Sequence, residues 1–255
     1  MGSLQGQTIV VTGGNSGIGL GTVLVLVERG ATVWTCDIGN EASDELRVHI
    51  DNGKVHFRGG VDVSSREASN KFMDEVVQTS GRLDGLFNNA GIGLYEGEIA
   101  SDENFSRMFE VNVRGTWNFA TYAFRVMRKQ EPRGKWQSRG NIVNNSSQAG
   151  IKGFQAIAAY CGTKHAVIGL TRAWGVEFAP YGIRVNAVAP GVIQTPALTA
   201  RIRDEPGWVD TIPKIPQGRF GETEEVGSTV AFLLGDDSSH ITSQVIPISG
   251  GITPH

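Results

Sequence analysis

The chain alternates between short apolar runs and longer segments of helical length, and this alternation limits the folds open to it. Seven runs of strand length, rich in Val and Ile, lie at residues 8–12, 31–37, 55–57, 83–88, 141–145, 183–188 and 244–248. Helical segments are expected at residues 18–29, 43–50, 64–78, 102–127, 157–178 and 222–234. Strands that alternate with helices pair in parallel. The sequence therefore predicts an α/β fold with a doubly wound, mostly parallel seven-stranded sheet and helices on both faces.

The bulk composition excludes several classes of protein. No linker interrupts the alternation, so residues 1–255 are expected to form a single domain. A formal net charge of −3 and the lack of a basic run argue against a nucleic-acid partner. No apolar run is long enough to span a membrane, and no signal peptide precedes the first strand. Two cysteines and five scattered histidines predict no metal site and fit a reducing, cytoplasmic location.

A glycine loop follows the first predicted strand. Gly13, Gly17 and Gly19 stand in the spacing Gly-x-x-x-Gly-x-Gly, which differs from the Gly-x-Gly-x-x-Gly fingerprint. A nucleotide pyrophosphate needs backbone N–H groups and a helix N-terminus at close range, which side chains would block. An ordinary tight turn is the alternative, but the position after the first strand favours nucleotide binding. The other expected cofactor contacts in the loop are Asn15, Ser16 and Ile18.

Asp37 ends the second predicted strand, eighteen residues beyond Gly19. A carboxylate there can accept hydrogen bonds from both hydroxyls of an adenine ribose. A 2′-phosphate would meet like charge, and neither the loop nor Ile38 offers a cation to bind it. Asp37 therefore favours NAD over NADP, although a solvated aspartate at a strand end is the simpler alternative.

Tyr160 and Lys164 are four residues apart, so they share one face of a predicted helix. Ser147 lies thirteen residues before Tyr160, just after a predicted strand. A free phenol titrates near about pH 10, and a neighbouring ammonium lowers that pKa toward the range of a general base. Tyr-x-x-x-Lys also occurs by chance in many helices. The three side chains are candidates for handling the proton of an alcohol or a carbonyl group.

Together these motifs resemble those of the short-chain dehydrogenase/reductase family, in its compact NAD(P)-dependent members. The matching residues, in order, are Thr12-Gly13-x-x-x-Gly17-x-Gly19, Asn88-Asn89-Ala90-Gly91, Asn112, Ser147, Tyr160-x-x-x-Lys164 and Pro190-Gly191. The match runs from about Gly6 to Gly251. The resemblance implies a single Rossmann-type NAD(P)-binding domain.

The resemblance implies a role for each matched residue. Tyr160 would be the general acid/base, Lys164 would bind the nicotinamide ribose, and Ser147 would bond the substrate oxygen. Asn112 would break its helix and hold a proton-relay water to Lys164. Asp62 would meet the adenine amino group. The further cofactor contacts implied are Val63, Asn89, Ala90, Gly91, Pro190, Gly191, Ile193 and Thr195. Ser146 is one residue out of register and is expected to bond backbone groups instead.

The implied activity is hydride transfer between NAD(H) and a secondary alcohol or ketone, with residues 196–216 folding over the substrate. The sequence leaves open whether that substrate is apolar or polar. A non-redox relative catalysing cyclisation or isomerisation, a cofactor-sensing binding protein and a purely structural protein are the alternatives. The complete Asn, Ser, Tyr and Lys set argues against them. Relatives commonly pack through helices such as 102–127 and 157–178, so a homo-oligomer, a tetramer or a dimer, is expected.

Three local features carry structural expectations. Pro247 lies within the last strand and predicts either an edge position or a missing ladder bond, because proline cannot donate to a ladder. Ser64 and Glu67 have the spacing of a capping box at the start of a helix. The polar segment 130–139 is expected to be a surface loop rather than a binding site.

Overall fold

The computed structural model describes residues 3–94, 96–204 and 206–253. Its strands form one seven-stranded sheet in the order β3-β2-β1-β4-β5-β6-β7, and every neighbouring pair is parallel. The strands are β1 (Thr8–Thr12), β2 (Thr32–Cys36), β3 (Val55–Arg58), β4 (Gly85–Asn88), β5 (Gly140–Asn145), β6 (Ile183–Pro190) and β7 (Val245–Ile248). The predicted α/β class and strand count are confirmed. Pro247 lies on β7, an edge strand, as predicted.

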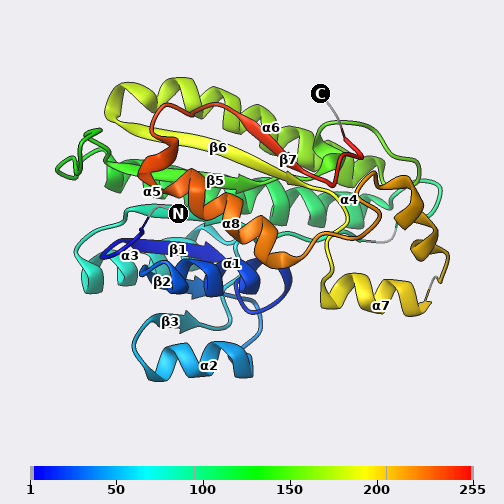
Figure 1. Cartoon of the computed structure of the whole chain (residues 1–255), viewed down its shortest axis with the longest axis horizontal. Coiled ribbons are helices and arrows are strands. Elements are labelled where there is room, and N and C mark those ends of the chain that lie inside the picture. The colour runs from blue at the N-terminus through cyan, green and yellow to red at the C-terminus, as the bar shows by residue number, and fades with distance from the viewer. Residues whose placement is uncertain (1–2, 95, 205, 254–255) are drawn as a thin grey trace.

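Helices cover both faces of this sheet (Figure 1). They are α1 (Gly17–Glu28), α2 (Asp44–Asp51), α3 (Arg66–Ser80), α4 (Asp102–Phe109), α5 (Gly115–Met127), α6 (Ala158–Glu177), α7 (Pro196–Asp204) and α8 (Thr223–Leu234). Short 3₁₀ segments follow β5, α6, α7 and α8: Gln148–Gly150, Ala179–Tyr181, Pro206–Lys214 and Asp236–Ser238.

Two apolar cores hold the layers together, one on each face of the sheet. One core joins α3, α5 and α6 through Phe72, Phe119 and Trp174. The other joins α1 and α8 through Leu26 and Val230. Each fully buried side chain of this size contributes roughly 1.5–3 kcal/mol to folding. The five inner strands are almost wholly buried for this reason, whereas the edge strands β3 and β7 are only partly buried.

The chain order reverses between β1 and β4, which lie side by side at the centre of the sheet. In a doubly wound sheet such a switch point opens a crevice at the carboxyl ends of the strands. Figure 1 shows α7 beyond those ends, apart from the helices that cover the faces. Most of the predicted site residues follow a strand or lie near the start of a helix, so the fold places them at one end of the sheet.

The single helix predicted for residues 102–127 is divided into α4 and α5 by a π-helical turn, Glu110–Arg114. Asn112 lies in this turn, and its side chain donates to the carbonyl of Ile92 (2.9 Å) and accepts from the N–H of Ile92 (2.8 Å). A contact from outside the helix thus holds the wide turn. Such π turns occur often at functional sites.

The helix cap predicted at Ser64 is one residue out of register. Ser65 is the N-cap of α3, and its hydroxyl accepts from the N–H of Ala68 at 3.2 Å. Ser64 instead donates its hydroxyl to Asp62 at 2.7 Å. Because Ser64 is bonded to the carboxylate of Asp62, the neighbouring Ser65 caps the helix.

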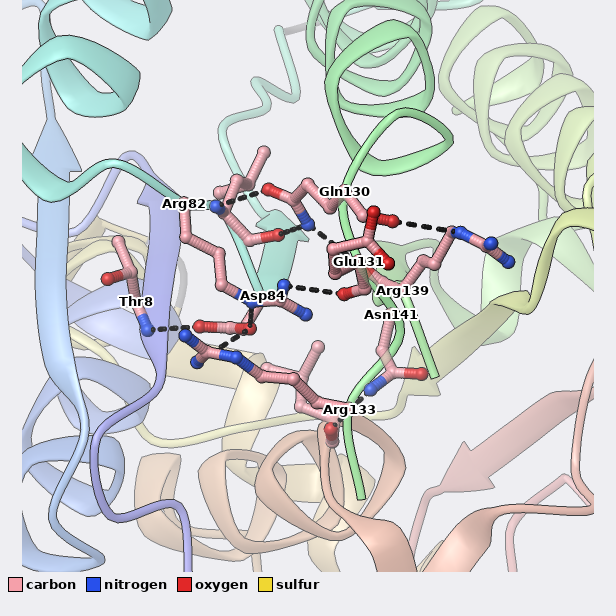
Figure 2. A network of polar contacts seen from close by, with 10 residues as sticks. Thr8, Arg82, Asp84, Gln130, Glu131, Arg133, Arg139 and Asn141 are labelled. Carbon is pink, nitrogen blue, oxygen red and sulfur yellow. Dashed lines mark hydrogen bonds and ion pairs between the residues drawn. The ribbon is translucent and has the colours of Figure 1, made fainter. Parts of the chain in front are cut away.

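Segment 130–139 is a largely exposed loop, as predicted, and a polar network fixes its base (Figure 2). The side chain of Gln130 accepts from the N–H of Leu83 (2.8 Å) and donates to its carbonyl (2.9 Å). Asp84, at the amino end of β4, accepts from the N–H of Thr8 at 2.9 Å and pairs with Arg82 and Arg133. This network lies at the amino ends of the strands, away from the crevice.

Candidate functional site

The crevice at the carboxyl ends of the strands holds a cleft of about 480 Å³, a size typical of small-molecule sites. The structure brings most of the predicted site residues together around it. Those that line it are Gly13, Ser16, Gly17, Ile18, Gly19, Asp37, Asp62, Val63, Asn89, Ala90, Gly91, Ser147, Tyr160, Lys164, Pro190, Gly191 and Thr195. Asn15, Asn112 and Ile193 are not among the lining residues.

The glycine loop forms an anion cradle at the start of α1. Gly13 and Gly17 have φ angles of +65° and +53°, which favour glycine. A Cβ on Gly19 would lie 2.0 Å from the carbonyl oxygen of Gly13, so no side chain fits there. The N-cap residue of α1, Ser16, makes no side-chain capping bond. The first N–H groups of α1 can therefore bind an anionic ligand, and the cradle fits the pyrophosphate of a dinucleotide.

Asp37 follows β2 and lines the cleft beside this cradle. Its carboxylate accepts from the N–H groups of Asn15 and Gly39, each at 3.2 Å. The side chain of Asn15 turns away from the cleft, because it donates to the carbonyl of Glu41 (2.8 Å) and accepts from the N–H of Ser43 (2.7 Å). Asn15 thus bonds Asp37 through its backbone N–H, and its contact with the cofactor stays a prediction.

Arg107, which the sequence did not single out, also lines the cleft. Arg107 on α4 donates to Asp62 at 3.2 Å and to the hydroxyl of Ser64 at 3.3 Å. Burial acts to raise the pKa of Asp62, but hydrogen bonds from Ser64 and Arg107 hold it below its usual value. Asp62 is therefore an ionised acceptor on the cleft. No sequence spacing pointed to Arg107, because it lies 45 residues from Asp62.

Tyr160 and Lys164 lie on α6, as their spacing predicts, and both line the cleft. The ammonium of Lys164 donates to the carbonyl of Asn145 at 2.9 Å and lies 5.6 Å from the centre of the Tyr160 ring. Burial lowers the pKa of Lys164 to about 8. Desolvation raises the pKa of Tyr160, and a hydrogen bond with Ser147 opposes that rise. The expected lowering of the pKa of Tyr160 is wrong for this structure, in which burial is the largest cause and raises that pKa.

The two serines after β5 have different roles. Ser147 lines the cleft, and its hydroxyl accepts from the N–H of Ala149 at 3.1 Å. Its hydroxyl proton stays available for the phenol or for a substrate oxygen. Ser146 is buried and donates its hydroxyl to the carbonyl of Lys164 at 2.9 Å. The predicted backbone role of Ser146 is confirmed.

Asn112 lies behind the cleft, with 1% of its surface exposed. Besides its two bonds with Ile92, its amide donates to the hydroxyl of Thr163 on α6 at 3.0 Å. A Cβ on Gly91 would lie 3.1 Å from Oδ1 of Asn112 and 3.4 Å from Nζ of Lys164, so these groups converge on one point. Asn112 thus connects the π turn to the helix that carries Tyr160 and Lys164.

Asn89 braces the glycine loop. Its amide donates to the carbonyls of Thr12 and Gly13, both at 3.0 Å, and its Oδ1 accepts from the amide of Asn145 at 2.9 Å. The hydroxyl of Thr12 accepts from the N–H groups of Asn89 and Ala90, each at 3.0 Å. One polar network therefore links the ends of β1, β4 and β5. Sequence reasoning did not identify Asn145 as part of it.

The segment after β6 closes the cleft from the opposite side. Pro190, Gly191 and Thr195 line it, and a Cβ on Gly17 would lie 3.4 Å from the methyl group of Thr195. The side chain of Ile193 is buried in the apolar core beneath α8, so the contact with the cofactor that the sequence predicts would be made by its backbone. Apolar packing thus anchors this segment, and its neighbours face the cleft.

Across the described ranges of the chain, no helix is long and apolar enough to cross a bilayer. The same ranges contain no group of three or more His, Cys, Asp or Glu side chains placed to hold a metal ion.

The sequence matches the family described as enoyl-(acyl carrier protein) reductase over residues 12–253. A 2,5-dichloro-2,5-cyclohexadiene-1,4-diol dehydrogenase of Sphingobium indicum is 37% identical over 257 residues, which cover 99% of each chain. A short-chain dehydrogenase/reductase of Pyricularia oryzae, ABA4, is 37% identical over 260 residues, with 97% of this chain and 92% of the relative covered. These similarities extend over nearly the whole chain.

Solved structures share the fold to the same extent. A xylitol dehydrogenase with bound NAD⁺ superimposes with a TM-score of 0.87 at 34% identity, covering 97% of this chain and 99% of the other. ElxO with bound NADP superimposes with a TM-score of 0.85 at 34% identity, covering 96% and 98%. Similar structures thus include one with each of the two nicotinamide cofactors.

Proposed function

The chain belongs to the short-chain dehydrogenase/reductase family, and we propose that it transfers a hydride between NAD(H) and a secondary alcohol or its ketone. One observation carries the proposal: Tyr160, Lys164 and Ser147 line the same cleft as the glycine cradle. A dinucleotide in the cradle and a substrate beside Tyr160 would thus share one cleft. The names of relatives, among them a diol dehydrogenase and a cyclopentanol dehydrogenase, support an alcohol as substrate.

In this proposal each polar group has one task. When bound, the nicotinamide supplies the hydride acceptor or donor. The phenol oxygen of Tyr160 takes the hydroxyl proton in oxidation and returns it in reduction, while the hydroxyl of Ser147 bonds the same substrate oxygen. Lys164 would hold the nicotinamide ribose, and Asn112 would hold the proton-relay water.

The protonation state of Tyr160 in this structure suits ketone reduction. Its pKa is raised by desolvation, so the phenol keeps its proton at neutral pH and is ready to act as the acid in ketone reduction. Acting as the base in alcohol oxidation requires positive charge nearer to the phenol. Lys164 is the group placed to supply that charge, since its ammonium already lies over the Tyr160 ring.

NAD is the proposed cofactor, in preference to NADP. Asp37 lines the ribose end of the cleft, and the cations among the described lining residues are Lys164, at the catalytic end, and Arg107, paired with Asp62. A 2′-phosphate next to Asp37 would therefore face an anion without a counter-charge. Replacing Asp37 with Ala should weaken NAD roughly 10- to 100-fold and leave NADP unchanged or tighter, because charged hydrogen bonds to the ribose are lost. Titration of both cofactors, with the exposed Asp51→Ala as control, measures this.

The segment 196–216 is proposed to cover the substrate. Pro196 and Ala197, at the start of α7, line the cleft, and the segment continues through the 3₁₀ turn Pro206–Lys214. Loops in this position gate turnover in many enzymes by excluding water.

Turnover is the test of the proposed function. The protein should reduce NAD when given a panel of apolar and polar secondary alcohols, and oxidise NADH with the matching ketones, as followed by the absorbance of NADH. Binding of NAD without turnover across both panels would contradict the proposal. That outcome would favour a non-redox reaction, cyclisation or isomerisation, or a cofactor-sensing role for the same cleft.

A cytoplasmic homo-oligomer, a tetramer or a dimer, is proposed for the whole molecule. Large apolar side chains stand exposed on the helices expected to pack between subunits: Phe105 on α4, Trp117 on α5 and Val176 on α6. Cys36 and Cys161 are both free and buried, as suits a reducing compartment. Sedimentation equilibrium tests the oligomer, and a monomer at micromolar concentration would contradict it.

A further inference from the structure

The loop between β4 and α4 (residues 89–101, the β4–α4 loop) carries a buried carboxylate with no counter-ion. Glu96 has 5% of its surface exposed, and among the acidic side chains that the structure describes only Asp84 is also buried. Asp84 pairs with two arginines, whereas Glu96 forms no ion pair with any described cation. A buried carboxylate needs strong hydrogen bonds to remain there.

Both oxygens of Glu96 bond the first turn of α6. One accepts from the N–H of Ala159 and the other from the N–H of Tyr160, each at 2.9 Å. The N-cap residue of α6, Ile157, makes no side-chain capping bond. Glu96 therefore caps this helix from more than sixty residues upstream. Its negative charge also lies at the end of the helix where the dipole is positive.

The same loop contacts the rest of the catalytic group. The backbone of Ile92 exchanges two hydrogen bonds with the side chain of Asn112, and a Cβ on Gly93 would lie 3.6 Å from the ring of Tyr160. The loop is therefore attached to the π turn at one end and to the start of α6 at the other. It lies beside the phenol between these two points.

We propose that Glu96 is a positioning residue that fixes Tyr160 by capping α6. Tyr160 is the third residue of the helix, so its N–H has no partner within the helix. Without an acceptor this turn is free to fray, and the phenol moves with it. A displacement of about 1 Å can lower the rate of a reaction on the order of 100-fold. The inference rests on the proposed function, in which Tyr160 is the acid/base.

Two substitutions at Glu96 measure its effect. Glu96→Ala removes both acceptors, and Glu96→Gln keeps one oxygen and places the NH₂ group of its amide, a donor, against the other N–H. We expect turnover at saturating NADH and ketone to fall on the order of 10- to 100-fold in Glu96→Ala and by less in Glu96→Gln. The dissociation constant of NADH should stay within about twofold, because the nucleotide cradle lies on other elements.

Matched variants separate positioning from loss of charge or stability. Glu98→Gln removes the same charge from an exposed side chain two residues away. Ser101→Ala removes the cap of α4, where the Ser101 hydroxyl accepts from the N–H of Asn104 at 3.1 Å. Ser101→Ala should lower the melting temperature and, below it, leave turnover unchanged. Glu98→Gln should change neither.

The outcomes decide the proposal. Turnover within about threefold of wild type in folded Glu96→Ala, or NADH affinity that falls in step with turnover, would overturn it. Amide hydrogen exchange provides a reading that needs no activity: residues 158–161 should exchange at least about tenfold faster in Glu96→Ala, with the middle of α6 unchanged. If the wild-type protein showed no turnover, the proposed function would be contradicted, but the capping of α6 by Glu96 would not. The capping by Glu96 would then be judged by exchange, and unchanged exchange would overturn it.

Discussion

Replacing Asp84 tests how strongly one buried anion stabilises the sheet that carries the site (Figure 2). The Asp84 side chain is 10% exposed and pairs with Arg82, which is 12% exposed, and with Arg133, which is 59% exposed. It also accepts from the N–H of Thr8 at 2.9 Å, and Thr8 belongs to the first residue pair of β1 and β2. Asp84→Ala therefore removes the carboxylate partner of the buried Arg82 and the acceptor of the Thr8 N–H.

The expected loss can be estimated from these contacts. An unsatisfied N–H costs about 1–3 kcal/mol, and breaking a buried ion pair costs about 3–5 kcal/mol. These two costs are not simply additive, because both arise from the same lost carboxylate, and Arg82 keeps its hydrogen bond to the carbonyl of Glu131. We expect Asp84→Ala to lower the free energy of unfolding by about 3–5 kcal/mol. Asp84→Asn keeps an acceptor for Thr8 and should lose about 2 kcal/mol.

Urea unfolding followed by circular dichroism measures both changes, and about 3–5 kcal/mol corresponds to a fall in melting temperature of about 10 °C for a chain of this size. Glu41→Gln is the control. Its ion pair with Arg47 is 87% and 55% exposed, so it should change stability by less than about 0.5 kcal/mol. A loss below about 1 kcal/mol in Asp84→Ala would refute the reasoning.

Two further predictions concern the cleft. Gly19→Ala places a Cβ 2.0 Å from the carbonyl oxygen of Gly13, so the cradle must open and NADH affinity should fall by at least about 100-fold. The control is Gly169→Ala, whose Cβ meets nothing within 4 Å and which should bind NADH as the wild type does. Isothermal titration checks this, and equal affinities would contradict it. Lys164 has its pKa lowered from 10.5 to about 8 by burial. Between these values the unfolded chain holds a proton that the folded chain lacks, so stability rises with pH across that window. Lys164→Met should be more stable than wild type at about pH 7, and its free energy of unfolding should not rise with pH across that window. If urea unfolding gave the two proteins the same dependence of stability on pH from about pH 7 to about pH 10, the prediction would be contradicted.

Local sequence predicted the sheet because most of its strands are short, apolar runs that are buried on both faces, and such runs appear in the sequence without any tertiary information. It failed at residues 102–127, where the helical pattern continues through the break. Glu110–Arg114 is a π turn, and within it the side chain of Asn112 is bonded to Ile92. That contact joins residues twenty positions apart, and no periodicity records it.

The glycine loop, Asp37, Ser147, Tyr160 and Lys164 were found because their chemistry follows from residue type and spacing. Glu96 and Arg107 were not found, because their partners are distant in the sequence and, for Glu96, are backbone groups that any residue carries. The pKa of Tyr160 was predicted in the wrong direction for the same reason. Sequence spacing places an ammonium near the phenol, but only the packed structure gives the larger effect of desolvation.

The most direct test of the account is turnover of Tyr160→Phe beside wild type, with NADH binding measured on the same samples. The phenol oxygen is the one atom lost, and the cradle around Gly17 and Gly19 stays intact. We expect an NADH dissociation constant within about twofold of wild type and turnover lower by about 100- to 10,000-fold. Turnover comparable to wild type would contradict the assignment of Tyr160 as the acid/base.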